Sequence, residues 1–354
     1  MAHTTLARVT VGVDTHKHTH VAAARDQLGS RLGTTQVAAN RAGYAQLLAW
    51  AHSLGEPVAW GVEGTGSYGA GLARFLAAHG QRVLEVNRPD RAARRRHGKN
   101  DPIDADAAAR AVQAGEATGT PKTQDGTVEM VRALRVARQS AIKARTQAIN
   151  ALKGLLVTAP AELREQLEGL STARLIRAAG ALDAGPLATP TAAAMLALCG
   201  LARRCQHLDA EISLLTGTLD RLTATGAPRL RALLGVGPDS AAALLIAAGD
   251  NPGRLHSEAA FAALCGTSPV EASSGKTRRH RLNRGGDRQA NAALHRIVIV
   301  RLRWHQPTRD YAARRTTQGK TRKETIRCLK RYLAREIFAA LHHTDRQDRI
   351  TTAA

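Results

Sequence analysis

Four acidic residues in the first third of the chain have the types and spacing of a metal site. Asp14 and Glu63 each end a short apolar, β-branched stretch, a pattern typical of a buried strand. Asp101 and Asp104 open a predicted helix with i,i+3 spacing and share one face of it, whereas Asp106 points away from the pair. A buried carboxylate is costly unless a cation meets it, and Mg²⁺ prefers carboxylate oxygens. The four residues therefore predict a site for two Mg²⁺ ions, which would clamp the attacking and leaving oxygens of a nucleic-acid phosphate.

Two other interpretations of the same region stay open. Asp101 and Asp104 would also cap and charge-stabilise the N-terminus of a helix without binding a metal. His16, His18 and His20 alternate along the chain and would form a zinc site if they lined one face of a strand, although histidines at this spacing usually decorate a solvated face.

The elements that must position these acids follow from the hydrophobic pattern. Strands are predicted at residues 8–14, 21–25, 34–38, 57–63 and 82–86. Asn40 is predicted to cap a helix that ends near Ser53, and Ser67 to cap the next helix. Three consecutive strands followed by alternation favour an α/β domain with a mixed sheet. If the first and fourth strands are neighbours, Asp14 and Glu63 project from one edge, where open α/β sheets bind ligands.

The charge of the chain predicts a polyanionic partner. The net charge is +22, from 51 Lys and Arg against 29 Asp and Glu, and each phosphate contact would release condensed counterions. Residues 275–354 contain 21 Lys or Arg and 6 Asp or Glu, a net +15, and residues 88–99 form a second basic segment. Aromatic residues make up only 3% of the chain, which argues against base-stacking platforms.

Beyond residue 125 the pattern is helical. Two long helices are predicted at 127–156 and 191–223, as an antiparallel or intermolecular coiled coil. Two amphipathic helices, at 287–304 and 323–342, would hold basic residues on a small core. The turn Gly235-Val236-Gly237 is predicted either to approach a phosphate through backbone amides or to be an ordinary helix–helix turn.

The chain is expected to be a cytoplasmic protein without a membrane partner. No apolar run approaches the roughly 18 residues of a membrane span, and the first residues do not read as a signal peptide. The four cysteines form no CxxC pair, which argues against a zinc ribbon and a disulfide scaffold.

Taken together, these segments resemble the DEDD-type insertion-sequence transposases, the recombinases associated with a bridge RNA. The matching stretches are Val11–Lys17, Glu63–Tyr68, Lys99–Ala105, Leu233–Pro238, Phe261–Pro269, Ser274–Lys276 and Arg284–Asp287. The resemblance implies an RNase H-like (RuvC-like) α/β metal-binding domain over 1–124 and a helical, coiled-coil-like oligomerisation segment over 125–225. It further implies a mainly α-helical basic transposase domain with a catalytic serine over 226–345, followed by a flexible tail at 346–354.

The resemblance also implies functional residues and partners. Asp14, Glu63, Asp101 and Asp104 would be the catalytic metal-binding quartet, and Ser274 the nucleophile that joins covalently to DNA, with the adjacent Ser273 as the alternative. Nucleic-acid contacts are expected from Lys17, Arg94, Arg95, Lys99, Lys276, Arg278, Arg279, Arg281 and Arg284. The partners would be double-stranded DNA at the element ends and target, a structured guide RNA, and further copies of the chain in a dimer or tetramer. The setting would be the bacterial cytoplasm, at the nucleoid. The metal site and the serine would meet across a domain or subunit interface.

Three competing functions stay open from the sequence alone. An actin-like or sugar-kinase ATPase would share the first strand, but it needs a second glycine-rich phosphate loop, which the sequence lacks. A non-catalytic DNA-binding protein would use the acids only structurally. A metal-dependent resolvase-like nuclease would use water in place of Ser274, and a covalent protein–DNA adduct would distinguish it from a serine recombinase.

Overall fold

The computed structural model describes residues 7–86, 101–251, 253–275 and 280–342. The chain divides into two compact units, each described here by itself. Unit 1 consists of Met1–Gly126 and Ala248–His256, and unit 2 of Thr127–Ala247 and Ser257–Ala354. Within the described residues, none of the helices combines the length and apolar character needed to cross a bilayer.

Unit 1 is built on a five-stranded mixed sheet with the strand order β3-β2-β1-β4-β5. Its strands are β1 (Arg8–Thr15), β2 (Thr19–Arg25), β3 (Arg31–Ala38), β4 (Glu56–Glu63) and β5 (Val83–Val86). Its helices are α1 (Arg41–Leu54), α2 (Ala70–Ala78) and α4 (Asp101–Gln113). β1 pairs antiparallel with β2 and parallel with β4. The predicted mixed sheet, with the first and fourth strands as neighbours, is confirmed.

The two faces of this sheet are covered by different helices. On β1, Val11 and Val13 belong to the apolar cluster that contains residues of α1 and α2, such as Leu47 and Leu72. Successive side chains of a strand point to opposite faces, so Gly12 and Asp14 face the other side. A Cβ on Gly12 would meet backbone atoms of α4. The face that carries Asp14 is therefore the face that α4 covers.

The two predicted helix caps of unit 1 have different outcomes. Asn40 caps α1, and its side chain accepts a hydrogen bond from the amide of Gly43. The prediction for Ser67 was wrong, because α2 begins after Gly69 and has no side-chain cap. The Ser67 hydroxyl donates instead to the carbonyl of Gly64, so it closes the turn that follows β4. A capping serine and a turn serine have the same sequence signature.

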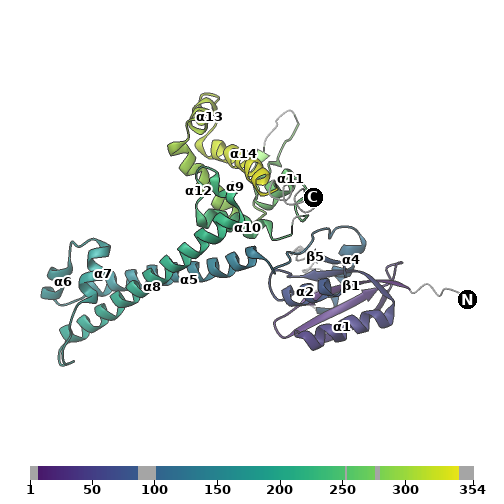
Figure 1. Ribbon diagram of the computed structural model, residues 1–354, viewed down its shortest axis with the longest axis horizontal. Helices are drawn as coiled ribbons and strands as arrows, with labels where there is room; N and C mark the ends of the chain where they lie inside the picture. The colour runs from purple at the N-terminus through teal and green to yellow at the C-terminus, as the bar shows by residue number, and fades with distance from the viewer. Residues whose placement is uncertain (1–6, 87–100, 252, 276–279, 343–354) are drawn as a thin grey trace, which may run out of the picture. The chain divides into compact units, whose positions relative to one another are not determined.

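Unit 2 begins with a long helical hairpin. Its helices are α5 (Thr127–Val157), α6 (Ala161–Leu167), α7 (Thr172–Gly180) and α8 (Pro190–Gly226). α5 and α8 lie side by side, with α6 and α7 at the end of the hairpin where the chain turns (Figure 1). Arg138 bonds to Thr216, and Arg145, further along α5, bonds to Asp209, further back along α8. The pair is therefore antiparallel within one chain, which was one of the two predicted arrangements.

A second group of helices completes unit 2. Its elements are α9 (Pro228–Ala232), α10 (Pro238–Ala248), α11 (Glu258–Leu264), β6 (Val270–Glu271), β7 (His280–Arg281), α12 (Arg288–Trp304), α13 (Gln306–Thr317) and α14 (Arg322–His342). The predicted amphipathic helices correspond to α12 and α14. In the turn between α9 and α10, Gly235 has φ +89° and packs on Ile297 of α12. Arg301 donates to the carbonyl of Leu234 in the same turn. These contacts favour the packed helix–helix turn over the phosphate contact.

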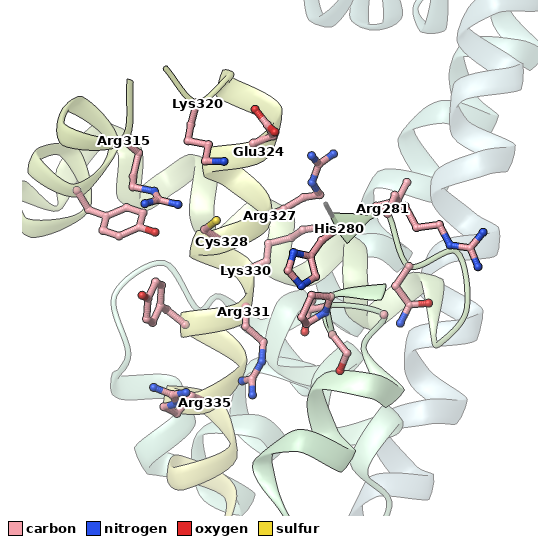
Figure 2. Close-up of a pocket in the computed structure, with 18 of the residues that line it drawn as sticks. His280, Arg281, Arg315, Lys320, Glu324, Arg327, Cys328, Lys330, Arg331 and Arg335 are labelled. Carbon is pink, nitrogen blue, oxygen red and sulfur yellow. The ribbon is translucent and has the colours of Figure 1, made fainter. Parts of the chain in front are cut away.

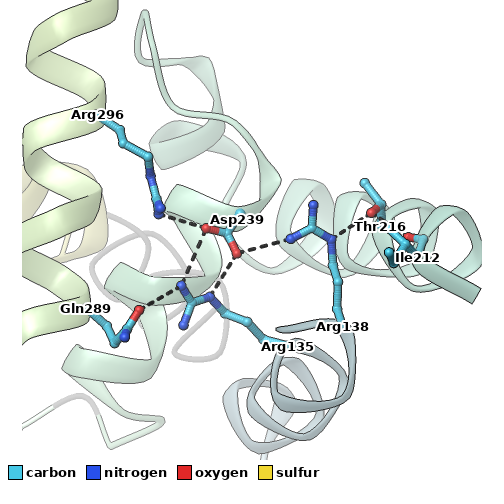
Figure 3. Close-up of polar contacts among 7 residues, drawn as sticks. All are labelled: Arg135, Arg138, Ile212, Thr216, Asp239, Gln289 and Arg296. Carbon is cyan, nitrogen blue, oxygen red and sulfur yellow. Dashed lines mark hydrogen bonds and ion pairs between the residues drawn. The ribbon is translucent and has the colours of Figure 1, made fainter. Parts of the chain in front are cut away.

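One carboxylate joins three helices of unit 2 (Figure 3). Asp239, in the first turn of α10, accepts hydrogen bonds from Arg135 and Arg138 of α5 and from Arg296 of α12. Arg135 is buried, with 5% of its surface exposed, and also donates to Gln289 of α12. Asp239 thus supplies the charge that allows Arg135 to be buried.

Candidate active site

The candidate active site lies where β1 and β4 end side by side. The parallel register pairs Val13 with Val62, so Asp14 and Glu63 are the next residues on each strand. Both residues are buried, each with 7% of its surface exposed. The hydroxyl of Thr15 donates to the carbonyl of Glu63 over 2.9 Å and ties the two strand ends together. This register places the two acids at one edge of the sheet, as predicted for neighbouring first and fourth strands.

α4 brings the other two acids to the same place, because glycines let it approach the sheet. A Cβ on Gly12 would lie 2.1 Å from the carbonyl oxygen of Ala105 and 2.2 Å from the amide nitrogen of Ala109. On β4, a Cβ on Gly61 would lie 2.8 Å from the carbonyl oxygen of Ala108. α4 therefore packs backbone against backbone on β1 and β4. Its first turn carries the remaining two predicted ligands, Asp101 and Asp104.

Replacing Gly12 by alanine tests this close approach. The new methyl group would overlap backbone atoms of α4, which no side-chain rotation can relieve, so α4 must move. We expect the free energy of unfolding to fall by about 2 kcal/mol, as for other overpacked cores. Urea unfolding measures this loss, and a DNA-cleavage assay should show reduced activity because Asp101 and Asp104 move with the helix. Gly33→Ala is the matched control, since its Cβ would make only an ordinary contact with Trp50, at 3.7 Å. Equal stability of the two variants would contradict the packing argument.

His16 joins two of the acids into a compact group of ligand atoms. Its Nε2 atom lies 3.2 Å from Oδ2 of Asp14 and 3.3 Å from Oδ2 of Asp101. Ligand atoms of Asp14, His16 and Asp101 all lie within 4.8 Å of one another, the one such group of three or more found in the described part of the chain. Glu63 and Asp104 lie outside this group. Sequence reasoning considered His16 only for a zinc site with other histidines and missed its place beside the acids.

Burial and the neighbouring acids both disfavour the negative charge of Asp14. Burial raises the pKa of Asp14 most strongly, and His16 opposes this rise. The charges of Asp104 and Asp101 raise the pKa further, which places both carboxylates close to Asp14. Asp14 makes its ion pair with His16 and with no lysine or arginine among the described residues. A bound cation would relieve both the burial and the repulsion.

The residues present fit a divalent cation. Carboxylate oxygens suit hard ions such as Mg²⁺, and an imidazole is compatible with several divalent metals. The Nε2 atom of His16 lies 3.2 Å from the carboxylate of Asp14 and 3.3 Å from that of Asp101, so the three side chains could hold one ion. Asp14 and Asp101 would hold such an ion, with His16 alongside.

The other histidines of the predicted zinc site and Asp106 lie apart from the group formed by Asp14, His16 and Asp101. His18 is exposed, while His20 is fully buried and stacks on Tyr44, so the three histidines form no zinc site. Burial lowers the pKa of His20. Asp106 faces away from the acidic site, as predicted, but it binds Arg25 of β2 through two hydrogen bonds of 2.7 and 2.9 Å. It is therefore a structural partner of the sheet.

The predicted nucleophile lies on a hairpin of unit 2. β6 pairs antiparallel with β7, and Ser273, Ser274 and Gly275 follow β6 toward the tip of this hairpin. Ser274 is exposed, and Gly275 has φ +54°, a conformation that glycine adopts readily. The hydroxyl of Ser274 is therefore accessible to a large substrate.

The predicted nucleic-acid contacts fall in several places. Lys17 is exposed in the turn between β1 and β2. Arg281 lines a cavity of about 910 Å³, here called the basic cleft, which is bounded by residues 266–269, β7 with residues 282–283, α13, Lys320 and α14. Arg284 lines an adjoining hollow of about 410 Å³. The remaining predicted contacts lie outside the described residues: Arg94, Arg95, Lys99, Lys276, Arg278 and Arg279.

Comparison with protein families gives two matches, both to transposases. A model described as a DEDD transposase of IS110 matches residues 11–159, which include all four acids of the candidate site. A second, described as a transposase of the IS116/IS110/IS902 family, matches residues 219–313, which include the hairpin with Ser274. The two matches together cover more than half of the chain. The search of curated proteins finds no match.

Proposed function

The chain belongs to the IS110 family of DEDD transposases, and from this premise we propose that it cuts and rejoins DNA strands with a Mg²⁺-dependent acidic site and a serine nucleophile. The family implies a DNA-processing enzyme that uses a divalent metal. The observation that carries the finer proposal is the convergence of Asp14 and Asp101 on His16, at the strand edge that also bears Glu63. Such a set of hard ligands in a basic chain suits phosphodiester chemistry.

The acids of unit 1 would hold the metal and the scissile phosphate. Asp14, Glu63, Asp101 and Asp104 are the proposed catalytic quartet, with His16 orienting Asp14 and Asp101. When bound, divalent cations would neutralise phosphate charge and favour loss of a proton from the attacking hydroxyl. The acids keep their places because β1, β4 and α4 are held together by backbone packing of Gly12 and Gly61 against Ala105, Ala108 and Ala109 of α4, just beyond the first turn that carries Asp101 and Asp104.

Ser274 is the proposed nucleophile. Its hydroxyl gives up a proton, its oxygen forms a bond to phosphorus, and the bond from phosphorus to one deoxyribose oxygen breaks, with that oxygen taking a proton. In the rejoining step a deoxyribose hydroxyl attacks the same phosphorus and releases the serine. The number of phosphodiester bonds is thus conserved, as recombination requires and hydrolysis does not. The exposed position of Ser274 on a glycine-hinged hairpin supports this role.

Three further parts of the proposal rest on separate observations. The mixed sheet, with three antiparallel strands followed by parallel ones and with acids at neighbouring strand ends, is compatible with an RNase H-like fold for unit 1. Association of copies through the α5–α8 hairpin would cover exposed apolar residues such as Val136 and Leu214, which are 56% and 69% exposed. A structured guide RNA would meet the excess positive charge of the chain, +22.

The test of this function is to trap the protein–DNA adduct. The full-length protein is incubated with DNA that carries the element ends, with Mg²⁺ and with the RNA transcribed from the flanking DNA, and the mixture is then denatured. We expect a fraction of the protein to migrate with covalently attached DNA, and this species to require the metal. Ser274→Ala should abolish it, and Ser273→Ala, the matched control, should retain it.

Each other outcome would replace a different part of the proposal. An adduct lost in Ser273→Ala and kept in Ser274→Ala would move the nucleophile one residue upstream. Cleaved DNA without any adduct would make water the nucleophile and the protein a resolvase-like nuclease. Binding of DNA without any metal-dependent cleavage would leave the acids with a structural role only.

A further inference from the structure

The basic cleft of unit 2 has a charge that its own residues do not balance. Eight of the described residues that line it are arginine or lysine, and one, Glu324, is acidic. Glu324 is committed to the N-terminus of α14, where its carboxylate accepts hydrogen bonds from the amide and the hydroxyl of Thr321. Among the described residues, Arg281 and Arg314 have no acidic partner, and Lys320 and Arg327 have only Glu324, whose pKa they help to lower, so the cleft is suited to a polyanion.

The side chains of α14 concentrate this charge along one wall. Arg327, Arg331 and Arg335 follow one another at i,i+4 spacing, an arrangement that destabilises an isolated helix through like-charge repulsion. Figure 2 shows Arg327, Lys330 and Arg331 extending from α14 toward the side of the cleft where His280 of β7 lies. Glu258 of α11 binds Arg331 and Arg335, whose hydrogen bonds lower the pKa of Glu258 to about 2. One carboxylate thus faces two of these arginines.

Two guanidinium groups in the cleft retain unused donors. Nη1 of Arg331 and Nε of Arg315 are buried and have no hydrogen-bond partner among the described residues. Buried donors are normally paired, and leaving one unpaired costs stability, so these atoms indicate an oxygen-bearing ligand. Lys330 is 8% exposed, donates to Asn291, and borders both the cleft and the adjoining hollow at Arg284. The two cavities are therefore neighbours that share Lys330 in their lining.

Aromatic rings stand among these cations. Tyr311 and Tyr332 both line the cleft, with ring centroids 5.5 Å apart and planes at 79°, and Tyr332 is 54% exposed. Arg314 and Arg315 lie over the Tyr311 ring, at 5.4 and 5.9 Å from its centroid. A basic groove with an exposed aromatic ring is the usual arrangement for binding a single strand, because phosphates contact the cations and a base stacks on the ring. The low aromatic content of the chain predicted otherwise, but half of its four tyrosines lie here.

We propose that the basic cleft binds an unpaired DNA strand beside the hairpin that carries Ser274, with phosphates on Arg327 and Arg331 and a base stacked on Tyr332. A cavity of about 910 Å³ accommodates a few nucleotides of one strand and no duplex. DNA is chosen over RNA because β7, on the same hairpin as Ser274, forms one wall of the cleft; in this respect the inference rests on the proposed function. The cleft would hold the strand that is cut, with its bases out of the duplex.

The binding test requires no catalysis. Fluorescence anisotropy is measured in EDTA with the full-length protein and a labelled single-stranded DNA, the same strand as a duplex, and an RNA of the same sequence. Tyr332→Ala is expected to weaken single-strand binding about tenfold, while Tyr332→Phe should bind as wild type. The Tyr332→Ala loss should disappear with an abasic strand. Arg327→Gln should lower the slope of log affinity against log salt by about 0.7.

Two variants outside the cleft serve as matched controls. Arg309→Gln removes an exposed arginine of α13 and Trp304→Ala an exposed aromatic residue, neither of which lines the cleft, and both should bind the strand as wild type does. Photo-crosslinking of a 5-iodouracil strand should label the peptide that contains Tyr332.

Three results would overturn the inference. They are unchanged binding by Tyr332→Ala and Arg327→Gln, a Tyr332-dependent preference for RNA over DNA of the same sequence, or crosslinks confined to other peptides. The outcome is separable from that of the proposed function: a missing adduct with Tyr332-dependent strand binding would refute the serine chemistry alone. An adduct without Tyr332-dependent binding would refute the cleft alone.

Discussion

Replacing Asp14 by asparagine is expected to reduce metal-dependent DNA cleavage by about 1,000-fold. Asp14 is the buried carboxylate of the site. It contacts His16, and the charges of Asp101 and Asp104 act on its pKa. Its loss would remove about 4 kcal/mol of transition-state stabilisation, the amount expected when a metal or its charge is displaced from a reacting phosphate. Single-turnover cleavage of DNA carrying the element ends, over a range of Mg²⁺ concentrations, measures the effect. Glu63→Gln should have a comparable effect.

The control for this experiment comes from the same strand. Glu56 lies at the opposite end of β4 from Glu63 and is exposed, so Glu56→Gln should retain full activity. Asp14→Asn should keep its unfolding temperature within a few degrees in metal-free buffer, because it removes a charge that burial disfavours. Asp106→Asn is unsuitable as a neutral control, since it breaks the pair with Arg25. Full cleavage activity in Asp14→Asn would refute the metal-site proposal.

Replacing Asp239 by asparagine is expected to lower the free energy of unfolding of unit 2 by about 3 kcal/mol, because it leaves the buried Arg135 without its charged partner. Arg296 donates to Asp239 at 2.7 Å and Arg135 at 3.1 Å, with Arg138 at 3.5 Å. The asparagine keeps the shape but leaves three guanidinium groups facing a neutral amide. Urea unfolding followed by the far-ultraviolet helical signal measures the change.

A second ion pair of the same unit gives the comparison. Asp209 binds Arg145 between α8 and α5, and both side chains are substantially exposed, at 48% and 33%. Asp209→Asn should therefore cost less than about 1 kcal/mol, as exposed pairs do. If the two variants lose equal stability, Asp239 does not act as the link among α5, α10 and α12.

The sequence by itself determined the strands of unit 1, the longest helices and the position of the two acids at strand ends. Apolar alternation over Val9–Val13 and Pro57–Val62 is a local property of the chain, because successive residues of a strand face opposite sides. It was therefore enough to place Asp14 and Glu63 at strand ends. The long apolar repeat of α5 was equally readable: residues 127–156 were predicted and Thr127–Val157 is observed. Short helices such as α6 and α13 were not predicted, since a few turns carry little periodicity.

Only the tertiary structure decided which side chains meet. Gly12 reads from the sequence as a weak strand residue, yet it is the point where α4 contacts β1, backbone to backbone. Arg25 and Asp106 are 81 positions apart, and Arg135 and Asp239 are 104 apart. No local pattern relates such residues. His16 and the acids likewise come together only when the turn after β1 and the start of α4 are folded.

For the basic cleft, too, the composition of the chain did not reveal where the residues lie in the folded protein. The sequence contains few aromatic residues, and that count correctly excludes an extended stacking platform. It does not show that Tyr311 and Tyr332 come together from two helices, in a cleft where arginine and lysine outnumber acidic residues. Periodicity is a local pattern of the chain, and net charge is a sum over all of its residues. A site is a set of contacts between residues that are far apart in the sequence. These contacts form only when the helices and strands pack together.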